Sequence, residues 1–304
     1  YYLYELPTVR FPDYYKLGVW ADSENNAYYM GTNTGSSRQY DIYAIDRESL
    51  INGVTPRNAQ FFQNFPNLLM PADQDGHMPA PKGSAGLLYT ILDGGESYFS
   101  NPPPANDSID LYEFAVDWET PANSSITLIN SFGPGDITDF IWTVCGFFQS
   151  NCLPQPGTSV RLDSGSWWPM QRFQYRNFGT YEMLLGTWTV DVLANGNHAA
   201  PRWFELRKPS GGEWSVYQEG THAPDLANRW EPSISMNGNG DIGLVYNAVD
   251  SDNNIRPGIR YAGRQEGDAL GVLRPEASLV EATGVQTSSS NRWGDYASMD
   301  IDPY

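Results

Sequence analysis

A short pattern of residues occurs twice in the second half of the chain. Arg-Trp stands at 229–230 and again at 292–293, and each pair is followed five residues later by Ser-Met. The two copies lie 63 residues apart, and looser versions of the pattern occur at 168–173 and 13–17. A fixed period of this size, filled with short strands, is typical of folds built from repeated β units.

The rest of the chain supports an all-β fold. Aromatic and β-branched residues recur in short runs that Gly, Pro, Asn and Asp interrupt, which is typical of strands joined by turns. We expect the acidic segment 69–76 to be a loop and a further repeat to begin at 294–301. The predicted strands are 14–20, 27–33, 40–46, 61–65, 86–92, 110–118, 125–131, 169–176, 181–192, 200–207, 214–218, 232–236, 241–249, 256–263 and 277–281.

Four strands per unit of about sixty residues match the blade of a β-propeller. We therefore predict one β-propeller domain over 1–304, with six or seven four-stranded blades when complete. The chain reads as an incomplete portion of it, because both ends resemble the middle or end of a strand, so the remainder of a larger polypeptide is expected. A β-sandwich is the alternative, but it does not explain the 63-residue recurrence.

The two cysteines, Cys145 and Cys152, lie in an irregular insertion at about 133–166. Six residues separate them, and no further Cys or nearby His suggests a metal site, so a disulfide is predicted. A disulfide indicates an oxidising compartment.

The net charge is −18, from 36 acidic and 18 basic residues. Such a surface repels phosphate backbones and anionic membranes, which argues against nucleic-acid binding. No run of eighteen apolar residues is present, so membrane insertion is not expected.

Six segments occur in a specific order: Phe11-Pro12-Asp13-Tyr14 to Trp20, Leu69 to Gly76, Tyr175 to Gly179, Arg202 to Arg207, Gln218 to Thr221 and Arg292 to Tyr296. In this order they resemble a family of large secreted bacterial β-propeller proteins that are loosely sialidase-like. The resemblance implies a propeller, an export route and an extracellular or cell-surface location, but no established activity. The chain departs from the family after residue 76 and around 166–168.

The Asp-x-Asp-Gly segment at 73–76 is the best metal candidate. The carboxylates of Asp73 and Asp75, two residues apart before a turn-forming Gly76, can share a hard cation, which predicts a structural Ca²⁺. The segment lacks the remaining ligands of an EF-hand, and an Asp-capped turn explains it equally well.

The repeated Arg-Trp pairs have two interpretations. In the functional one, arginines at the start of inner strands converge on the central funnel and bind a ligand there. In the structural one, each Trp packs between blades and each Arg pairs with a neighbouring Asp, which the repetition favours. The candidate ligand-binding residues are Arg172, Arg229, Arg292, Asp295, Tyr296 and Asp13.

No segment has a specific catalytic signature. Sialidase Asp boxes and a Gly-x-Ser-x-Gly nucleophile motif are absent, and His77, His198 and His222 are predicted to be loop residues. The sequence therefore favours an extracellular binding or surface-display module whose ligand is carbohydrate or another extracellular protein. The alternatives are a polysaccharide-degrading enzyme, lyase or glycoside hydrolase, with its site at the funnel, and a structural subunit of a surface layer or filament.

Overall fold

The computed structural model describes residues 6, 8, 11–22, 26–34, 39–96, 102–146, 151–193, 197–295 and 297–302. The described chain is dominated by β-strands, as predicted, and it divides into two compact units. Unit 1 comprises residues 1–136, 175–184 and 208–214, and unit 2 comprises 137–174, 185–207 and 215–304. Each unit is described by itself.

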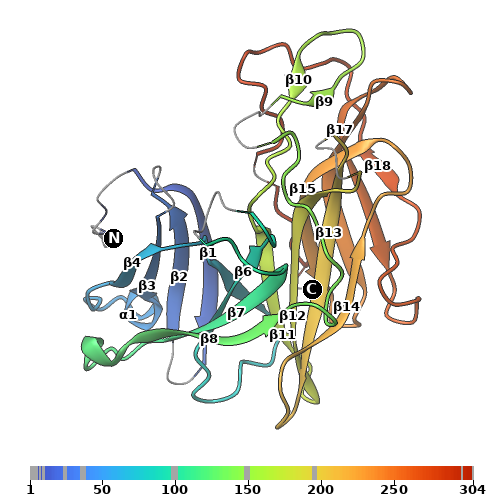
Figure 1. Ribbon diagram of the computed structural model, residues 1–304. Helices are drawn as coiled ribbons and strands as arrows, with labels where there is room; N and C mark the ends of the chain where they lie inside the picture. The colour runs from blue at the N-terminus through green and yellow to red at the C-terminus, as the bar shows by residue number, and fades with distance from the viewer. Residues whose placement is uncertain are drawn as a thin grey trace. The chain divides into compact units, whose positions relative to one another are not determined.

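Unit 1 begins with a four-stranded antiparallel sheet in which each strand pairs with the next along the chain (Figure 1). Its strands are β1 (Asp13–Ala21), β2 (Asn26–Asn33), β3 (Tyr40–Asp46) and β4 (Gln60–Phe65). The alternation in β1 buries Lys16, Gly18 and Trp20 on one face, which is the pattern of a strand with one covered side. Gly18 is required there, because a Cβ at this position would clash with the carbonyl oxygen of Ala72.

A short helix, α1 (Arg47–Asn52), connects β3 and β4. Its N-cap is Asp46, whose Oδ1 accepts the backbone N–H of Ser49 at 3.1 Å. The helix ends at Gly53, which adopts the left-handed conformation with φ 68°. This helix was not predicted, because six residues are too few to show a helical period.

The second half of unit 1 contains another antiparallel run of strands. They are β5 (Met70–Asp75), β6 (Gly86–Leu92), β7 (Ser108–Ala115) and β8 (Ser125–Phe132), with a 3-10 turn at Pro121–Asn123. The prediction of a loop at 69–76 is wrong, because residues 70–75 form β5 and only Gly76, with φ 87°, makes the turn. The strand β5 was not predicted because its polar residues, Asp73, Gln74 and Asp75, are typical of loops.

Unit 2 opens with the irregular segment that holds the two cysteines. Cys145 and Cys152 form the predicted disulfide, with their Cα atoms 5.3 Å apart. Two short strands follow, β9 (Leu153–Pro154) and β10 (Arg161–Leu162), which pair with each other. Leu153 and Leu162 are fully buried in a cluster that includes Cys145, so the disulfide lies against a hydrophobic core.

Strands β11 (Met170–Asn177), β12 (Tyr181–Asp191) and β13 (Ala199–Pro209) contribute residues to both units, and β14 (Ser215–Thr221) belongs to unit 2. A four-stranded antiparallel sheet then follows in the order of the sequence (Figure 1). Its strands are β15 (Asn228–Met236), β16 (Ile242–Asp250), β17 (Ile255–Arg264) and β18 (Ala277–Val280).

The predicted strand at 294–301 is not formed by the described residues of that segment. Instead, Met299 is attached to β15 by side-chain hydroxyls: Ser233 Oγ accepts its N–H at 2.8 Å, and Ser235 Oγ donates to its carbonyl oxygen at 2.6 Å. The backbone of Met299 is thus bonded by side-chain hydroxyls of β15.

Bonds of this kind recur between positions about one repeat apart. In unit 2, the side-chain amide of Gln174 donates to the Met236 carbonyl at 3.1 Å and accepts its N–H at 2.7 Å. In unit 1, Asp73 Oδ1 accepts the N–H of Val19 at 3.0 Å, and the side chain of the adjacent Gln74 accepts the N–H of Ala21 at 2.9 Å. Side-chain to main-chain hydrogen bonds thus join β1 to β5 in unit 1 and β11 to β15 in unit 2.

The repeated tryptophans also contact each other. Trp230 is fully buried, as predicted, and its indole N–H donates to the carbonyl oxygen of Trp293 at 3.2 Å. Trp293 packs against the same hydrophobic cluster but is only partly buried. Trp293 is therefore less buried than Trp230, although both tryptophans contact the same cluster.

Among the described residues, no helix has the length and apolar character needed to cross a membrane.

Candidate functional site

The structure gives the three predicted arginines different partners. Arg229 is fully buried and forms an ion pair with Glu276, Nε to Oε2 at 2.8 Å. Arg172 is also buried, and its NH1 lies 3.5 Å from Asp300 Oδ1. Arg292 is exposed and pairs with Asp295 at 3.0 Å. Of the predicted ligand-binding residues, only Arg292 and Asp295 form a described ion pair with each other.

The other predicted site residues lie elsewhere in the chain. Asp13 is exposed at the start of β1, where its Oδ1 accepts the N–H of Tyr14 at 2.8 Å. Tyr296 lies outside the described residues. Asp73 and Asp75 lie on β5, and Asp73 also holds Val19 by the hydrogen bond described above. Within the described ranges, no group of three or more His, Cys, Asp and Glu residues could hold a metal ion, so calcium at Asp73 and Asp75 stays a prediction.

Glu276 is the centre of a buried polar network in unit 2. Its Oε1 accepts from Arg229 at 2.9 Å and from Arg260 at 2.6 Å. Its Oε2 accepts from Arg229 at 2.8 Å and from the hydroxyl of Tyr246 at 2.7 Å. The ring nitrogen Nε2 of His222 lies 3.0 Å from the Tyr246 hydroxyl. Residues of β15, β16, β17 and the loop after β14 are thus joined through one carboxylate.

The electrostatics of this network follow from burial and hydrogen bonding. Burial alone raises the pKa of Glu276, but hydrogen bonds from His222, Arg229, Tyr246 and Arg260 outweigh it and hold this pKa well below its usual range. Burial first, and then the neighbouring Glu276 carboxylate, raise the pKa of the Tyr246 hydroxyl. The carboxylate is therefore ionised and the phenol is neutral at ordinary pH.

This network resembles a catalytic site in its residue types but not in its accessibility. Tyr246 is 1% exposed and Arg229 is 0% exposed, and each is hydrogen-bonded to Glu276. A nucleophilic tyrosine must be accessible to its substrate, and an arginine that binds an anionic ligand must have N–H donors that the ligand can reach. The arrangement therefore supports the structural interpretation of Arg229.

The histidines show what the sequence missed. His222 follows β14 as expected, but it is buried and contacts Tyr246, so the prediction of an ordinary loop residue is incomplete. His198 lies outside the strands as predicted, but it is not exposed as such a residue commonly is: it is 4% exposed, and its Nε2 lies 3.1 Å from the Ala227 carbonyl oxygen. Glu276 was not singled out, because it is far in sequence from Arg229 and follows no motif.

An open recess in unit 1 has the features of a ligand site. Its volume is ≈ 560 Å³, and we call it the Tyr181 recess. Tyr181 stacks on Phe178 with ring centroids 4.9 Å apart and planes 17° apart, and the guanidinium of Arg176 lies 5.9 Å from the Phe178 centroid. The lining residues are Met78, Pro81, Asn177, Gly179, Tyr181, Glu182, Lys208, Ser210, Gly211, Gly212 and Glu213.

Only the last ring of this stack, Tyr181, lines the recess. Next to it, Glu182 is held by two neighbours: its Oε2 accepts from the Tyr175 hydroxyl at 2.7 Å, and its Oε1 lies 3.4 Å from the ammonium of Lys208. Lys208 also lines the recess, so the recess presents an aromatic ring, a carboxylate and an ammonium whose positions are set by their neighbours.

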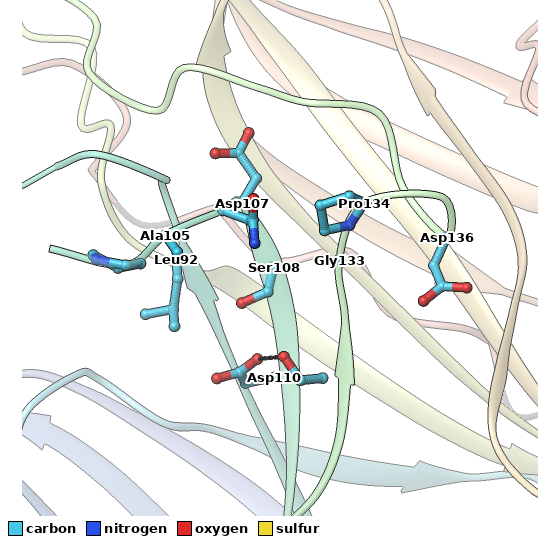
Figure 2. Close-up of a pocket in the computed structure, with 11 residues that line it drawn as sticks. Leu92, Ala105, Asp107, Ser108, Asp110, Gly133, Pro134 and Asp136 are labelled. Atoms are coloured by element: carbon cyan, nitrogen blue, oxygen red, sulfur yellow. Dashed lines mark hydrogen bonds between the residues drawn. The ribbon is translucent and has the colours of Figure 1, made fainter.

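A second pocket in unit 1, of ≈ 420 Å³, is lined by the carboxylates of Asp107, Asp110 and Asp136 (Figure 2). Asp107 Oδ1 accepts the N–H of Gly94 at 2.6 Å, and Asp110 Oδ1 accepts from the Ser131 hydroxyl at 2.6 Å. Both carboxylates thus have a structural role: Asp107 binds the backbone at Gly94, and Asp110 binds a side chain of the neighbouring strand β8. A bound ligand is not needed to explain their presence in the pocket.

Comparison with known proteins finds no matching family, no matching curated protein and no matching solved structure. Function must therefore be argued from the residues of the two units.

Proposed function

We propose that the chain is part of an extracellular β-propeller that binds carbohydrate through the Tyr181 recess. The propeller is supported by the two four-stranded antiparallel sheets with sequential strand order, β1–β4 and β15–β18. It is also supported by the hydrogen bonds that join first strands of neighbouring repeats, such as Gln174 to Met236. The disulfide supports an oxidising, extracellular location. The resemblance to secreted bacterial propeller proteins belongs to the same proposal.

The observation that carries the binding function is the composition of the Tyr181 recess. A sugar ring has an apolar face of C–H groups and a rim of hydroxyls. Tyr181 offers a flat apolar surface, while Glu182 and Lys208 offer an acceptor and a donor on the same recess. Because Tyr175 and Lys208 already orient the carboxylate of Glu182, little conformational entropy is lost when a ligand binds.

The charge of the chain narrows the ligand to a neutral carbohydrate. With a net charge of −18, the protein repels acidic polysaccharides over long distances. The one ammonium of the recess, Lys208, is already paired with Glu182 and offers no excess positive charge.

The test is affinity electrophoresis and calorimetry with a panel of soluble neutral and acidic polysaccharides. Tyr181→Ala is expected to weaken binding of a neutral polysaccharide about tenfold, which corresponds to about 1.4 kcal/mol. Tyr15→Ala is the matched control, because Tyr15 is an exposed tyrosine of unit 1 that does not line the recess. Equal affinities of both variants and the unmodified protein would contradict the site, and release of new reducing ends would favour a degrading enzyme instead.

A second candidate function, a subunit of a surface layer or filament, is favoured by strand β18. This strand lies at an edge of its sheet, and Leu279 and Val280 are 61% and 50% exposed. Exposed apolar edge strands promote pairing between chains. Sedimentation velocity tests it: assembly that Leu279→Lys abolishes would support this function, and a monomer at all concentrations would contradict it.

A further inference from the structure

A groove in unit 1, separate from the Tyr181 recess, lies at strand β4. Its volume is ≈ 480 Å³, and we call it the β4 groove. β4 is the last strand of its sheet, so one of its edges pairs with β3 and the other faces no strand in the described part of the chain (Figure 1). The lining includes Asn58, Phe61, Phe62, Pro121, Ala122 and Ser124.

The side chains of β4 show that the groove spans this free edge. Successive side chains of a strand point to opposite faces of the sheet, yet Phe61 and Phe62 both line the groove. On one face, Phe61 stacks on Tyr43 of β3, with ring centroids 6.0 Å apart and planes 29° apart. On the other, Phe62 packs edge-on against Phe114 of β7, with centroids 5.4 Å apart. The groove therefore lies over the edge, where unpaired N–H and carbonyl groups of the backbone point outward.

The walls of the groove are held in place by their neighbours. Gln60 Nε2 donates to the carbonyl oxygen of Asp117 at 2.8 Å, and Gln60 Oε1 accepts from the hydroxyl of Ser124. These bonds attach the start of β4 to the segment that carries the 3-10 turn. Phe61 is 39% exposed, although it rests on the buried ring of Tyr43. The groove thus offers a fixed aromatic surface that an apolar side chain of a ligand can cover.

The surroundings of the groove are acidic. Glu119 is exposed beside the 3-10 turn that forms one wall. Hydrogen bonds, the strongest from the Thr120 N–H, hold the pKa of Asp117 below its usual range, so this carboxylate is ionised. Arg57, which directly precedes the groove residues in the chain, is already paired with Asp46 at 2.9 Å. A basic ligand is therefore attracted, whereas a second copy of a chain with net charge −18 is repelled.

We infer that the β4 groove binds an extended, basic segment of a partner protein as an added β-strand. Main-chain hydrogen bonds to the edge of β4 supply affinity, and one apolar side chain of the segment packs against Phe61 and Pro121. Basic residues on either side of it are attracted by Asp117 and Glu119. The site and its protein ligand go beyond the carbohydrate site proposed above and do not depend on it.

The probes are pentapeptides of the form acetyl-Lys-Thr-X-Thr-Lys-amide, in which X is Gly, Ala, Val, Leu or Phe, and the measurement is calorimetry with the whole chain. Affinity is expected to rise about tenfold from X = Gly to X = Leu, because the leucine side chain is removed from water in the groove. The Leu peptide with both lysines replaced by glutamate is expected to bind more weakly. If no peptide binds saturably, or if affinity does not depend on X, the inference is wrong.

Two N-methylated forms of the Leu peptide test the addition of a strand. One carries methyl groups on the amide nitrogens of both threonines, and the other carries one on the amide nitrogen of the leucine. Only alternate N–H groups of an added strand face its neighbour, so one form is expected to bind about tenfold more weakly and the other to bind like the parent. Equal binding by both forms and the parent would overturn the inference.

Two matched pairs of variants locate the site. Ala122→Trp fills the groove from an exposed position and is expected to abolish binding of the Leu peptide, whereas Ala105→Trp, at an exposed alanine of another loop of unit 1, is not. Glu119→Lys is expected to weaken binding more than Asp136→Lys, which changes the net charge equally at an exposed position of unit 1 outside the groove.

The variants also identify any other occupant of the groove. Equal peptide binding by Ala122→Trp and Ala105→Trp would overturn the inference. Without peptide binding, a neutral polysaccharide whose binding Ala122→Trp abolishes would assign the groove to carbohydrate, and a dimer that Ala122→Trp abolishes would assign it to a second copy of the chain. Either result would likewise overturn the inference.

Discussion

At the scale of single residues, the two arginines of the repeated Arg-Trp pattern illustrate what a sequence repeat does and does not determine. Arg229 is fully buried and bound to Glu276, whereas the equivalent Arg292 is 61% exposed and bound to Asp295. The structural interpretation of the repeat predicted that each arginine pairs with a neighbouring Asp, and both do, Arg229 with Asp225 at 2.8 Å and Arg292 with Asp295 at 3.0 Å. The repeat did not distinguish their surroundings: Arg229 lies within β15, whereas the described residues around Arg292 form no strand.

The difference in burial predicts different costs of removing each arginine. Arg229→Ala removes a fully buried guanidinium and its two hydrogen bonds to Glu276, which keeps Arg260 and Tyr246 as partners, and is expected to lower the free energy of unfolding by about 1.5–3 kcal/mol. Arg292→Ala, the control, removes an exposed ion pair and is expected to cost less than about 1 kcal/mol. Chemical denaturation of both variants is the measurement, and similar values would contradict the structural interpretation of Arg229.

The same network predicts how stability depends on pH. The folded-state pKa of Glu276 lies well below the unfolded value of about 4.3, so the folded protein binds fewer protons than the unfolded chain as the pH falls. The stabilisation is therefore complete above about pH 5 and is lost progressively at lower pH. Thermal midpoints between pH 7 and pH 3 are expected to fall more steeply for the unmodified protein than for Glu276→Gln. Parallel curves for the two proteins would show that the ionisation of Glu276 does not cause the loss of stability at low pH.

At the scale of secondary structure elements, the helix α1 depends on one buried carboxylate. Asp46 caps the helix through Ser49 N–H, and its other oxygen, Oδ2, accepts from Arg57 Nε at 2.9 Å and from the Arg57 backbone N–H at 3.1 Å. The burial of Asp46 raises its pKa, but the hydrogen bonds from Ser49 and Arg57 outweigh this effect and lower it overall.

Asp46→Ala is therefore expected to lower the free energy of unfolding by about 1–3 kcal/mol, because it removes the N-cap and leaves buried donors unsatisfied. Glu48→Ala is the control, since Glu48 lies in the first turn of the same helix but its side chain is 57% exposed. Urea denaturation of both variants is the measurement. A cost for Glu48→Ala as large as that for Asp46→Ala would show that charge near the helix terminus, and not the buried cap, stabilises α1.

The strands of this protein were largely predictable and its sites were not, for a physical reason. Alternation of apolar and polar residues is local, so β1, β12 and β16 could be placed to within a residue or two. β5 was missed because Asp73 and Gln74 face neighbouring backbone N–H groups and look like loop residues. The Tyr181 recess brings together residues near 80, 180 and 210, and a local sequence pattern cannot predict contacts between residues so far apart in the chain.

At the scale of the whole molecule, the net charge of −18 makes the folded state sensitive to cations. General screening by salt and binding of a specific ion would both raise stability, so they must be separated. Specific binding is predicted at Asp73 and Asp75, which lie two residues apart on β5 next to the turn at Gly76.

Ca²⁺ at about 100-fold its dissociation constant is expected to add about 2.7 kcal/mol to the free energy of unfolding. Thermal denaturation with Ca²⁺, with chelator and with Na⁺ at equal ionic strength is the measurement. Asp75→Asn is the informative variant, because it removes one charge and leaves the hydrogen bond from Val19 to Asp73 intact. A midpoint that responds to Ca²⁺ no more than to Na⁺, together with no metal by elemental analysis, would leave Asp73 with a structural role, which includes joining β5 to β1.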